Sequence, residues 1–182
     1  MDLKSGYPFW AIRNGLMQPV PRLDADLRCD VLVIGGGITG ALIADALIGR
    51  GHDVVVVEQR DIAWGSTAAS TALLQYEIDT HLVDLAKRYG DADAALAYRA
   101  CGDAIDMLGE VARGLRDVDF ERADSLYYAS RKRDVASLRE EYEARRRHGF
   151  DIEYLESEAL KAEYGIDAPA ALRSRQIGRA HV

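Results

Sequence analysis

The sequence predicts an α/β protein that begins with a Rossmann-like βαβ unit and continues into a mixed α+β domain. Two apolar runs, 31–34 and 54–57, have the unbroken hydrophobicity of buried parallel strands. A glycine cluster and a helix-like segment connect them, as expected for a right-handed βαβ crossover. Beyond residue 115, strand-like and helix-like segments alternate, which indicates the mixed second domain.

The first part of the chain yields four elements in order. Residues 1–28 carry aromatic side chains among prolines without a helical or alternating period, so we expect an irregular arm packed on the domain surface. Val31–Ile34 and Val54–Val57 predict the two strands. The helix between them is closed by Gly49 and Gly51. Its small and apolar face comprises Ala41, Leu42, Ala44, Leu47 and Ile48.

The second part begins with two helices. A short helix is expected over residues 80–89, closed by Gly90, and a longer one starts near Asp91. Apolar residues recur along the longer helix at steps of four and three, which predicts a face buried in the core. This stripe consists of Cys101, Ile105, Leu108, Ala112 and Leu115.

Three further elements follow. Residues 125–129 and 150–155 predict strands, and residues 134–148 predict a charged surface helix ended by Gly149. The basic run 145–147 follows several glutamates in that helix, so we expect it on a solvated face of alternating charge.

Composition limits the class of protein. Apolar residues make up 48% and charged residues 29%, which is ordinary for a soluble globular protein. The net charge of −7 argues against a nucleic-acid partner. Cys29 and Cys101 give neither a disulfide framework nor a zinc pattern, so we expect no metal and a cytoplasmic location. The tract 31–48 contains four glycines and Asp45 and is no membrane span, and residues 1–10 do not resemble a signal peptide.

The glycine cluster Gly35-Gly36-Gly37-Ile38-Thr39-Gly40 forms a G-x-G-x-x-G motif between a strand and a helix. Gly35 permits the tight turn, Gly37 lets a pyrophosphate approach the backbone, and Gly40 lets the helix pack closely on the sheet. We expect the N–H groups around Ile38 and Thr39 to face the phosphates, aided by the positive end of the helix dipole. The motif therefore predicts a dinucleotide site.

An acidic residue completes this motif. Glu58 ends the second strand, where a carboxylate can accept hydrogen bonds from the adenosine ribose hydroxyls. A negative charge there disfavours NADP, whose 2′-phosphate requires a basic residue. Gln59 is expected to help line the adenosine end.

Residues 64–74, WGSTAASTALL, are rich in small side chains and hydroxyls. Together with the βαβ unit, this tract resembles the FAD-dependent oxidoreductases of the D-amino acid oxidase and glycine oxidase family, including amine oxidoreductases of the γ-glutamylputrescine oxidase type. The resemblance implies that Ser66 and Thr67 lie along the phosphates and that Thr71, Ala72 and Leu73 reach the flavin. Small side chains let amides approach a ligand, and hydroxyls donate to its oxygens. One departure is that Thr71-Ala72 stands where many members carry a Gly-containing pair.

The resemblance, which covers roughly residues 25 to 175, implies FAD as cofactor and a small-molecule amine or amino acid as substrate. The reaction would be oxidation at the C–N bond by hydride transfer to flavin, followed by hydrolysis of the imine. The resemblance also implies an FAD-binding domain over 29–115 and the beginning of a substrate domain over 116–175. Residues 176–182 follow no structural pattern and are expected to be a non-native tail on a truncated chain.

Two alternatives stay open, an NAD-dependent dehydrogenase and an inert dinucleotide-binding module. No catalytic residue is assigned, because the family's substrate-facing residues belong to a later part of the chain. His52, His81 and His148 are expected at the surface. The sequence leaves undetermined the amine, the electron acceptor, covalent attachment of the flavin and the oligomeric state.

Overall fold

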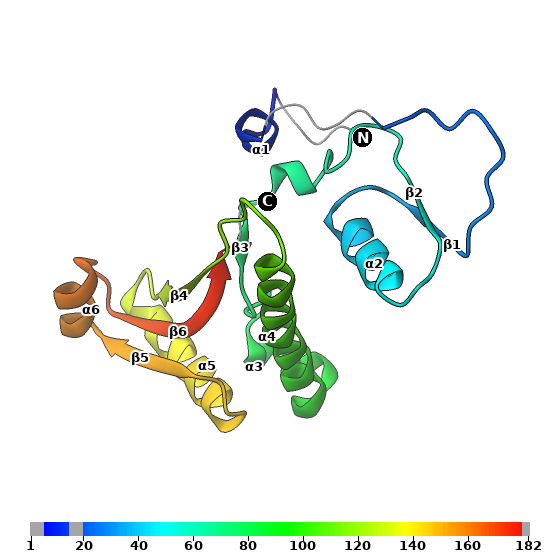
Figure 1. Cartoon of the computed structure of the whole chain (residues 1–182). Helices are drawn as coiled ribbons and strands as arrows, with labels where there is room; N and C mark the ends of the chain where they lie inside the picture. Colours follow the sequence, from blue (N-terminus) through cyan, green and yellow to red (C-terminus); the bar gives the residue numbers. More distant parts are fainter. Residues whose placement is uncertain (1–5, 15–19, 180–182) are drawn as a thin grey trace. The chain divides into compact units, whose positions relative to one another are not determined.

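The computed structural model describes residues 6–14 and 20–179. The chain divides into two compact units, residues 1–71 and 72–182, and each is described by itself (Figure 1). The first unit comprises α1 (Phe9–Arg13), β1 (Val31–Ile34), α2 (Ile38–Ile48), β2 (Val54–Val57) and the 3-10 turn η1 (Thr67–Ala69). The second comprises β3 (Leu73–Leu74), α3 (Leu82–Tyr89), α4 (Asp91–Arg113), β4 (Glu121–Tyr128), η2 (Lys132–Asp134), α5 (Val135–Arg147), β5 (Ile152–Glu156), α6 (Ser157–Tyr164) and β6 (Ala170–Arg179).

The first unit contains the predicted βαβ arrangement. β1 and β2 pair in parallel, with Val31 opposite Val54 and Ile34 opposite Val57. Helix α2 connects them and ends at Ile48, with Gly49 as its C-cap. Val33 is buried against α2, since its Cγ1 lies 3.3 Å from where a Cβ on Gly40 would stand. The strand–turn–helix–strand prediction is confirmed.

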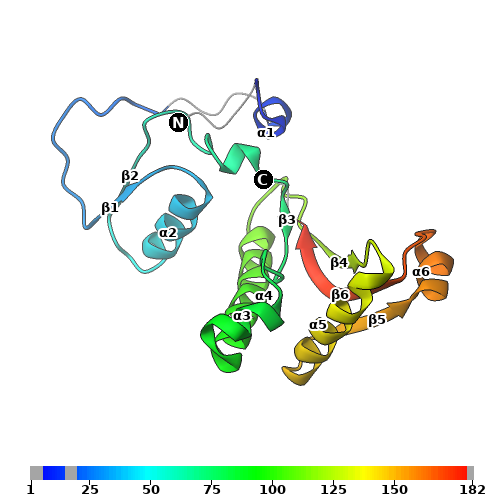
Figure 2. The same ribbon diagram turned by 180° about the vertical axis from the view of Figure 1, so that it is seen from behind.

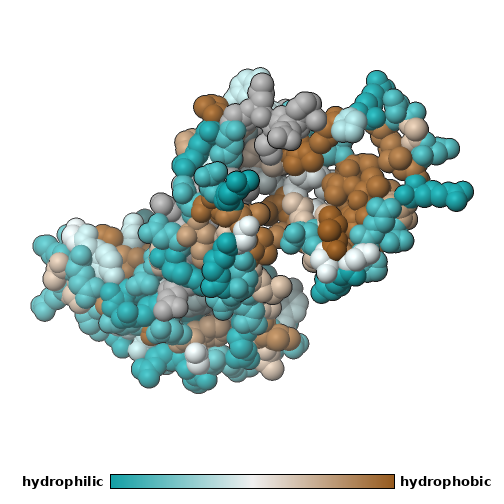
Figure 3. All heavy atoms as spheres, viewed as in Figure 1, coloured by the Kyte–Doolittle hydropathy of each residue, from teal (hydrophilic) through white to brown (hydrophobic). Residues whose placement is uncertain are grey.

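The opposite face of this parallel pair differs from the expectation of fully buried strands. Leu32 is 53% exposed and Ile34 is 82% exposed. Successive side chains on a strand point to opposite faces, so these residues project away from α2. In Figure 3 hydrophobic residues gather over part of the first unit. The unbroken apolar run therefore has one covered and one uncovered face among the described residues.

The N-terminal arm is only partly irregular. Phe9–Arg13 form the short helix α1, preceded by Pro8, so the expectation of an arm without helical structure is wrong there. The indole Nε1 of Trp10 donates to the carbonyl of Ser70 at 2.7 Å. The rings of Tyr7 and Trp64 meet edge to face with centroids 6.2 Å apart. The arm thus packs on the tract 64–70, as predicted for a surface arm, while residues 1–5 and 15–19 lie outside the described part.

In the second unit, β6 is the central strand of an antiparallel sheet. β4 runs along one edge of it, with Tyr127 opposite Leu172. β5 and β3 pair with the other edge, β5 near the start of β6 and β3 near its end. Helix α5 packs against β5 and β6 and lies in front of them in Figure 2. This confirms a mixed α+β arrangement after the βαβ unit.

The elements α6 and β6, like the shorter β3 and η2, were not predicted. β6 continues through Arg179, which pairs with Glu121 on one side and Leu73 on the other. The expectation that residues 176–182 take no part in an element is therefore wrong for the backbone of residues 176–179. Residues 180–182 lie outside the described part, and a non-native origin of the segment stays a prediction.

The predicted stripe of α4 is only partly buried. Ile105 belongs to a core cluster with Tyr76, Leu82 and Tyr98, and Cys101 packs against that cluster while half-buried. Leu115 is 56% exposed, because α4 ends at Arg113 and the helical period no longer applies beyond it. The core prediction holds for the middle of the stripe and fails at its end.

Helix α5 is solvated on one face only: Arg146 and Arg147 are exposed as predicted, whereas Arg145 is buried, so the expectation is wrong for that residue. Glu141 and Arg145 are fully buried, and Arg145 Nε donates to Glu141 Oε1 at 2.7 Å. The two oxygens of Glu141 accept the N–H groups of Leu82 and Val83 at 2.8 and 3.0 Å, which caps the start of α3. Arg145 Nη1 also donates to Glu77 Oε1 at 3.3 Å. Helix α5 thus contains a buried ion pair, Glu141–Arg145, which its alternating charges did not predict.

Aromatic rings enclose this ion pair. The guanidinium of Arg145 lies 5.8 Å from the ring centre of Tyr76 and 5.4 Å from that of Tyr98, within range of a cation–π attraction. Burial raises the pKa of both tyrosine hydroxyls, so the two rings stay neutral beside it. The network joins α3, α4, α5 and the segment after β3.

Helices α3 and α4 belong to the second compact unit, whereas the sequence grouped them with the first domain. Assignment of residues 29–115 to FAD binding and 116–175 to substrate binding is a functional division and stays a prediction. No helix among residues 6–14 and 20–179 has both the length and the hydrophobicity to cross a bilayer.

We expect Arg145→Met to lower the free energy of unfolding by about 3–5 kcal/mol, because it leaves the buried carboxylate of Glu141 without its cation. The exposed neighbour Arg147, changed to Met, serves as control and should cost no more than about 0.5 kcal/mol. Urea unfolding followed by far-ultraviolet circular dichroism measures both. Equal effects of the two substitutions would contradict the buried network.

Candidate dinucleotide-binding site

The glycine turn follows directly from β1. The N–H of Gly35 donates to the carbonyl of Val57 at 2.8 Å, which extends the parallel ladder by one residue. Gly35 then turns the chain with φ +111°, a backbone conformation that side chains rarely adopt. A Cβ on Gly40 would lie 1.9 Å from the carbonyl oxygen of Gly35. Both positions therefore require glycine, as the motif predicted.

The start of α2 is closed by a side chain from the tract 64–74. Gly37 is the N-cap residue, and the N–H of Ile38 donates to Thr67 Oγ1 at 3.0 Å. A Cβ on Gly37 would stand 3.0 Å from that hydroxyl oxygen. The Ile38 N–H thus already has an acceptor within the chain, and the expectation that it faces a phosphate stays a prediction. Thr39 is exposed in the first turn of α2.

Glu58 lies beside the glycine turn. Its Oε2 accepts the N–H of Gly36 at 2.8 Å, and its Oε1 accepts the N–H of Arg60 at 3.0 Å. Hydrogen bonds from these amides, Gly36 first, hold the pKa of the carboxyl below its usual value. The carboxylate is therefore ionised at neutral pH and fixed in orientation by the backbone.

The remaining predicted residues are distributed more widely. Gln59 and Ser66 are exposed next to Glu58 and Thr67 in sequence. Thr71 is the last residue of the first unit, and Leu73 opens β3 in the second. Ala72 adopts φ +59°, the left-handed region that favours glycine. The structure thus brings together the site residues of the first unit, namely Gly35, Gly37, Ile38, Gly40, Glu58 and Thr67.

Sequence reasoning missed the part played by Gly36, which stood as a variable position of the motif. Gly36 is buried, and a Cβ there would lie 3.3 Å from Glu58 Cβ and 3.5 Å from Ile62 Cδ1. Its carbonyl accepts the N–H of Ala63 at 2.8 Å. A bond between a side chain and a backbone amide far away in sequence follows no regular spacing. The glycine at this otherwise variable position of the motif was therefore the sequence's hint of the contact.

The three described histidines differ in their surroundings. His52 is exposed as expected, but His81 meets the ring of Tyr127 edge to face and is half-buried. His148 is half-buried as well, with Nε2 2.9 Å from Asp91 Oδ2, so the surface expectation is wrong for these two. No group of three or more His, Cys, Asp or Glu side chains is arranged to hold a metal within the described ranges.

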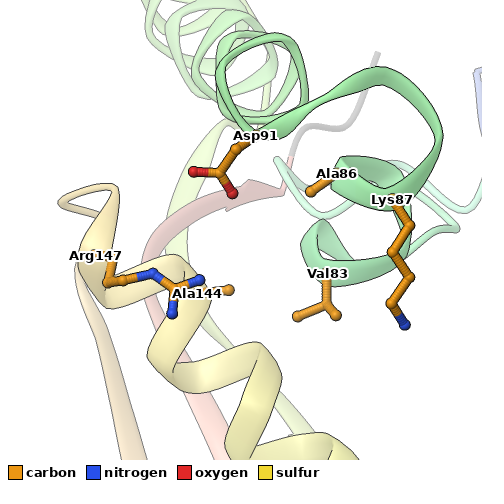
Figure 4. Close-up of a pocket in the computed structure, with 6 residues that line it drawn as sticks. All are labelled: Val83, Ala86, Lys87, Asp91, Ala144 and Arg147. Carbon is orange, nitrogen blue, oxygen red and sulfur yellow. The ribbon is translucent and has the colours of Figure 1, made fainter.

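One pocket lies between α3, the start of α4 and α5, within the second unit (Figure 4). It is an open depression of about 340 Å³. Lys87 at its rim is paired with Asp84 at 2.8 Å. None of the predicted site residues lines this depression, whose members are Val83, Ala86, Lys87, Asp91, Ala144 and Arg147.

Comparison with protein families gives a match over most of the chain. The family model described as FAD dependent oxidoreductase matches residues 30–182. It covers the glycine turn, Glu58, the tract 64–74 and the elements of the second unit.

Three proteins similar to the chain are each much longer than it. A protein of Bacillus subtilis named as a Rieske 2Fe-2S iron-sulfur protein is 33% identical over 72% of this chain and 26% of its own length. The γ-glutamylputrescine oxidoreductase of Escherichia coli is 28% identical over 95% of this chain and 41% of its own length. Among solved structures, glycine oxidase of Bacillus cereus superposes with a TM-score of 0.61 at 21% identity, over 84% of this chain and 40% of that chain. The chain thus spans less than half the length of these proteins.

We expect Gly40→Ala to destabilise the first unit by more than about 3 kcal/mol, because the new methyl group would overlap the carbonyl of Gly35 and force α2 away from β1. Gly49→Ala, at the other end of the same helix, is the matched control. A Cβ there would lie 3.4 Å from its nearest neighbour at an ordinary helical φ of −60°, so the cost should be below about 1 kcal/mol. Thermal unfolding of both variants, with the exchange of α2 amides as a local probe, tests the difference. An equal loss in both would refute the close approach.

Proposed function

The chain belongs to the family of FAD-dependent oxidoreductases, and from this membership we propose that its first unit binds FAD through the glycine turn, the start of α2 and Glu58. The observation that carries the proposal is the ionised carboxylate of Glu58, held 2.8 Å from the N–H of Gly36 beside a turn that requires glycine. A dinucleotide needs both features, since its pyrophosphate approaches the bare backbone and its ribose approaches the acid.

The pyrophosphate fits the start of α2. The N-terminal end of a helix attracts anions, and glycine at position 37 leaves room for a phosphate against the backbone. Thr67 Oγ1 accepts the Ile38 N–H and still has its own proton to donate, so it can link the helix to a phosphate oxygen. Ser66 and Thr39, both exposed next to this point, supply further hydroxyls.

The adenosine ribose fits Glu58. Each carboxylate oxygen accepts one backbone N–H and keeps a lone pair for a ribose hydroxyl. The negative charge disfavours the 2′-phosphate of NADP. Gln59, exposed beside it, is proposed to line the adenosine.

The flavin end of the cofactor is assigned to Thr71, Ala72 and Leu73. The left-handed backbone of Ala72 supports this assignment, because many members of the family carry a Gly-containing pair at this place. On this assignment residues 29–115 serve FAD binding and residues 116–175 begin the substrate domain.

We propose that the protein oxidises the C–N bond of a small-molecule amine or amino acid. The names of two similar proteins, γ-glutamylputrescine oxidoreductase and glycine oxidase, support this substrate class. Bound FAD would supply the redox chemistry by accepting a hydride. The residues of this chain would bind the cofactor's phosphates and ribose and fix its position. The two cysteines are unpaired, which supports a reducing compartment such as the cytoplasm.

Replacing Glu58 by Ala should weaken FAD binding about tenfold to a hundredfold, because hydrogen bonds to a charged group contribute roughly 1.5–3 kcal/mol. Asp61→Ala, which removes an exposed carboxylate from the same loop, is the control and should leave the affinity unchanged. Titration of the protein with FAD, followed by quenching of flavin fluorescence, gives both dissociation constants. An unchanged affinity in folded Glu58→Ala, or preferential binding of NAD by the original chain, would argue against an FAD site here.

The 182-residue chain should bind FAD without oxidising amines, since it spans 41% of γ-glutamylputrescine oxidoreductase and placing the substrate carbon against the flavin accounts for much of catalysis. The measurement is anaerobic bleaching of bound flavin on addition of amino acids or polyamines. Flavin reduction by any of them would show that this chain already holds a complete substrate pocket.

A further inference from the structure

We propose that Glu58 is also a positioning residue, which holds the glycine turn in its binding conformation through bonds made entirely within the chain. This goes beyond the ribose contact of the proposed function, and only its benefit for dinucleotide binding rests on that function. The proposal concerns residues 58–63, the segment that follows β2 and wraps around Gly36.

Gly36 is tied to this segment through both of its backbone polar groups. Its N–H donates to Glu58 Oε2 at 2.8 Å, and its carbonyl accepts the N–H of Ala63 at 2.8 Å. The peptide is buried, so each of these groups would be costly to leave without a partner. The carbonyl of Gly36 is held by a backbone amide, which no side-chain substitution removes. Its N–H is held by the side chain of Glu58, so a substitution there would leave this N–H without its acceptor.

The second oxygen of Glu58 fixes the carboxylate itself. Oε1 accepts the N–H of Arg60 at 3.0 Å, so the side chain is bound at both ends of its carboxylate group. The guanidinium of Arg60 adds a weaker favourable charge. A carboxylate held in this way loses little rotamer freedom when it meets a further donor, which is the energetic gain of preorganisation.

The packing around Gly36 fits the same arrangement. A Cβ at residue 36 would stand 3.3 Å from Glu58 Cβ and 3.5 Å from Ile62 Cδ1, so the segment 58–63 lies directly against the turn. Thr67 holds the next amide but one, that of Ile38. Glu58 and Thr67 therefore fix the turn at two points, before the helix and at its first residue.

The test is the behaviour of the Gly36 amide in the full chain without added FAD, observed by nuclear magnetic resonance. In the original protein we expect this amide to exchange slowly with solvent. Its proton shift should follow the ionisation of Glu58 as the pH is lowered from 7, because a carboxylate acceptor loses its charge on protonation. In Glu58→Ala the exchange of Gly36 should speed up about tenfold to a hundredfold and the titration of its shift should vanish.

Two further variants keep the result specific. Asp61→Asn removes a neighbouring charge and should leave the Gly36 amide unchanged. Glu58→Gln keeps the size of the side chain but replaces one acceptor by a donor, so it should lose the pH-dependent shift even if Glu58→Ala fails to fold. A Gly36 shift that titrates with the carboxyl reports a direct bond to Glu58, which mere packing of the side chain against the turn would not produce.

The outcomes separate the two proposals. If Gly36 exchanges as fast in the original chain as in Glu58→Ala, or its shift ignores pH, the positioning role is overturned whether or not FAD binds. If Gly36 is protected and titrates but FAD does not bind, the positioning role stands and the cofactor assignment falls. Protection, titration and FAD binding together support both.

Discussion

The close approach of α2 to the end of β1 is the constraint on which the first unit depends. With a Cβ on Gly40 only 1.9 Å from the carbonyl of Gly35, the helix can lie this near the turn only because residue 40 has no side chain. This approach places the start of α2 beside the end of β2 and brings Thr67 to the Ile38 amide. The arrangement of the site is thus a consequence of backbone packing, and the polar side chains add to a geometry that glycine already permits.

Short-range patterns explain which parts of the structure could be predicted from sequence. β1, α2 and β2 were predicted closely because apolar runs, a glycine motif and helix-ending glycines are all local signals. β6 was missed because its residues alternate too irregularly to suggest a strand, and its place depends on partners distant in sequence. Arg145 was misread for a similar reason, since nothing in a run of three arginines tells which one faces a buried glutamate.

The same limit applies to the site. The glycines and Glu58 were identified because each occupies a defined place relative to a strand or helix. The bonds that Glu58 makes to Gly36 and Arg60, and the cap that Thr67 provides for Ile38, depend on loop geometry that no spacing encodes. The left-handed conformation of Ala72 could be predicted only in part. The departure from the family's glycine pointed to the position, but not to its φ angle.

The central position of β6 has a consequence for how the second unit forms during synthesis. β3, β4 and β5 all leave the ribosome before β6, yet each of them pairs with β6 in the sheet. Until β6 emerges none of them has a partner among the described strands of this sheet, and the contact between Leu73 and Arg179 must close a very long loop. Unpaired strand edges of this kind are prone to aggregate, so the nascent chain should depend on chaperones for longer than a protein whose strands pair in the order they are made.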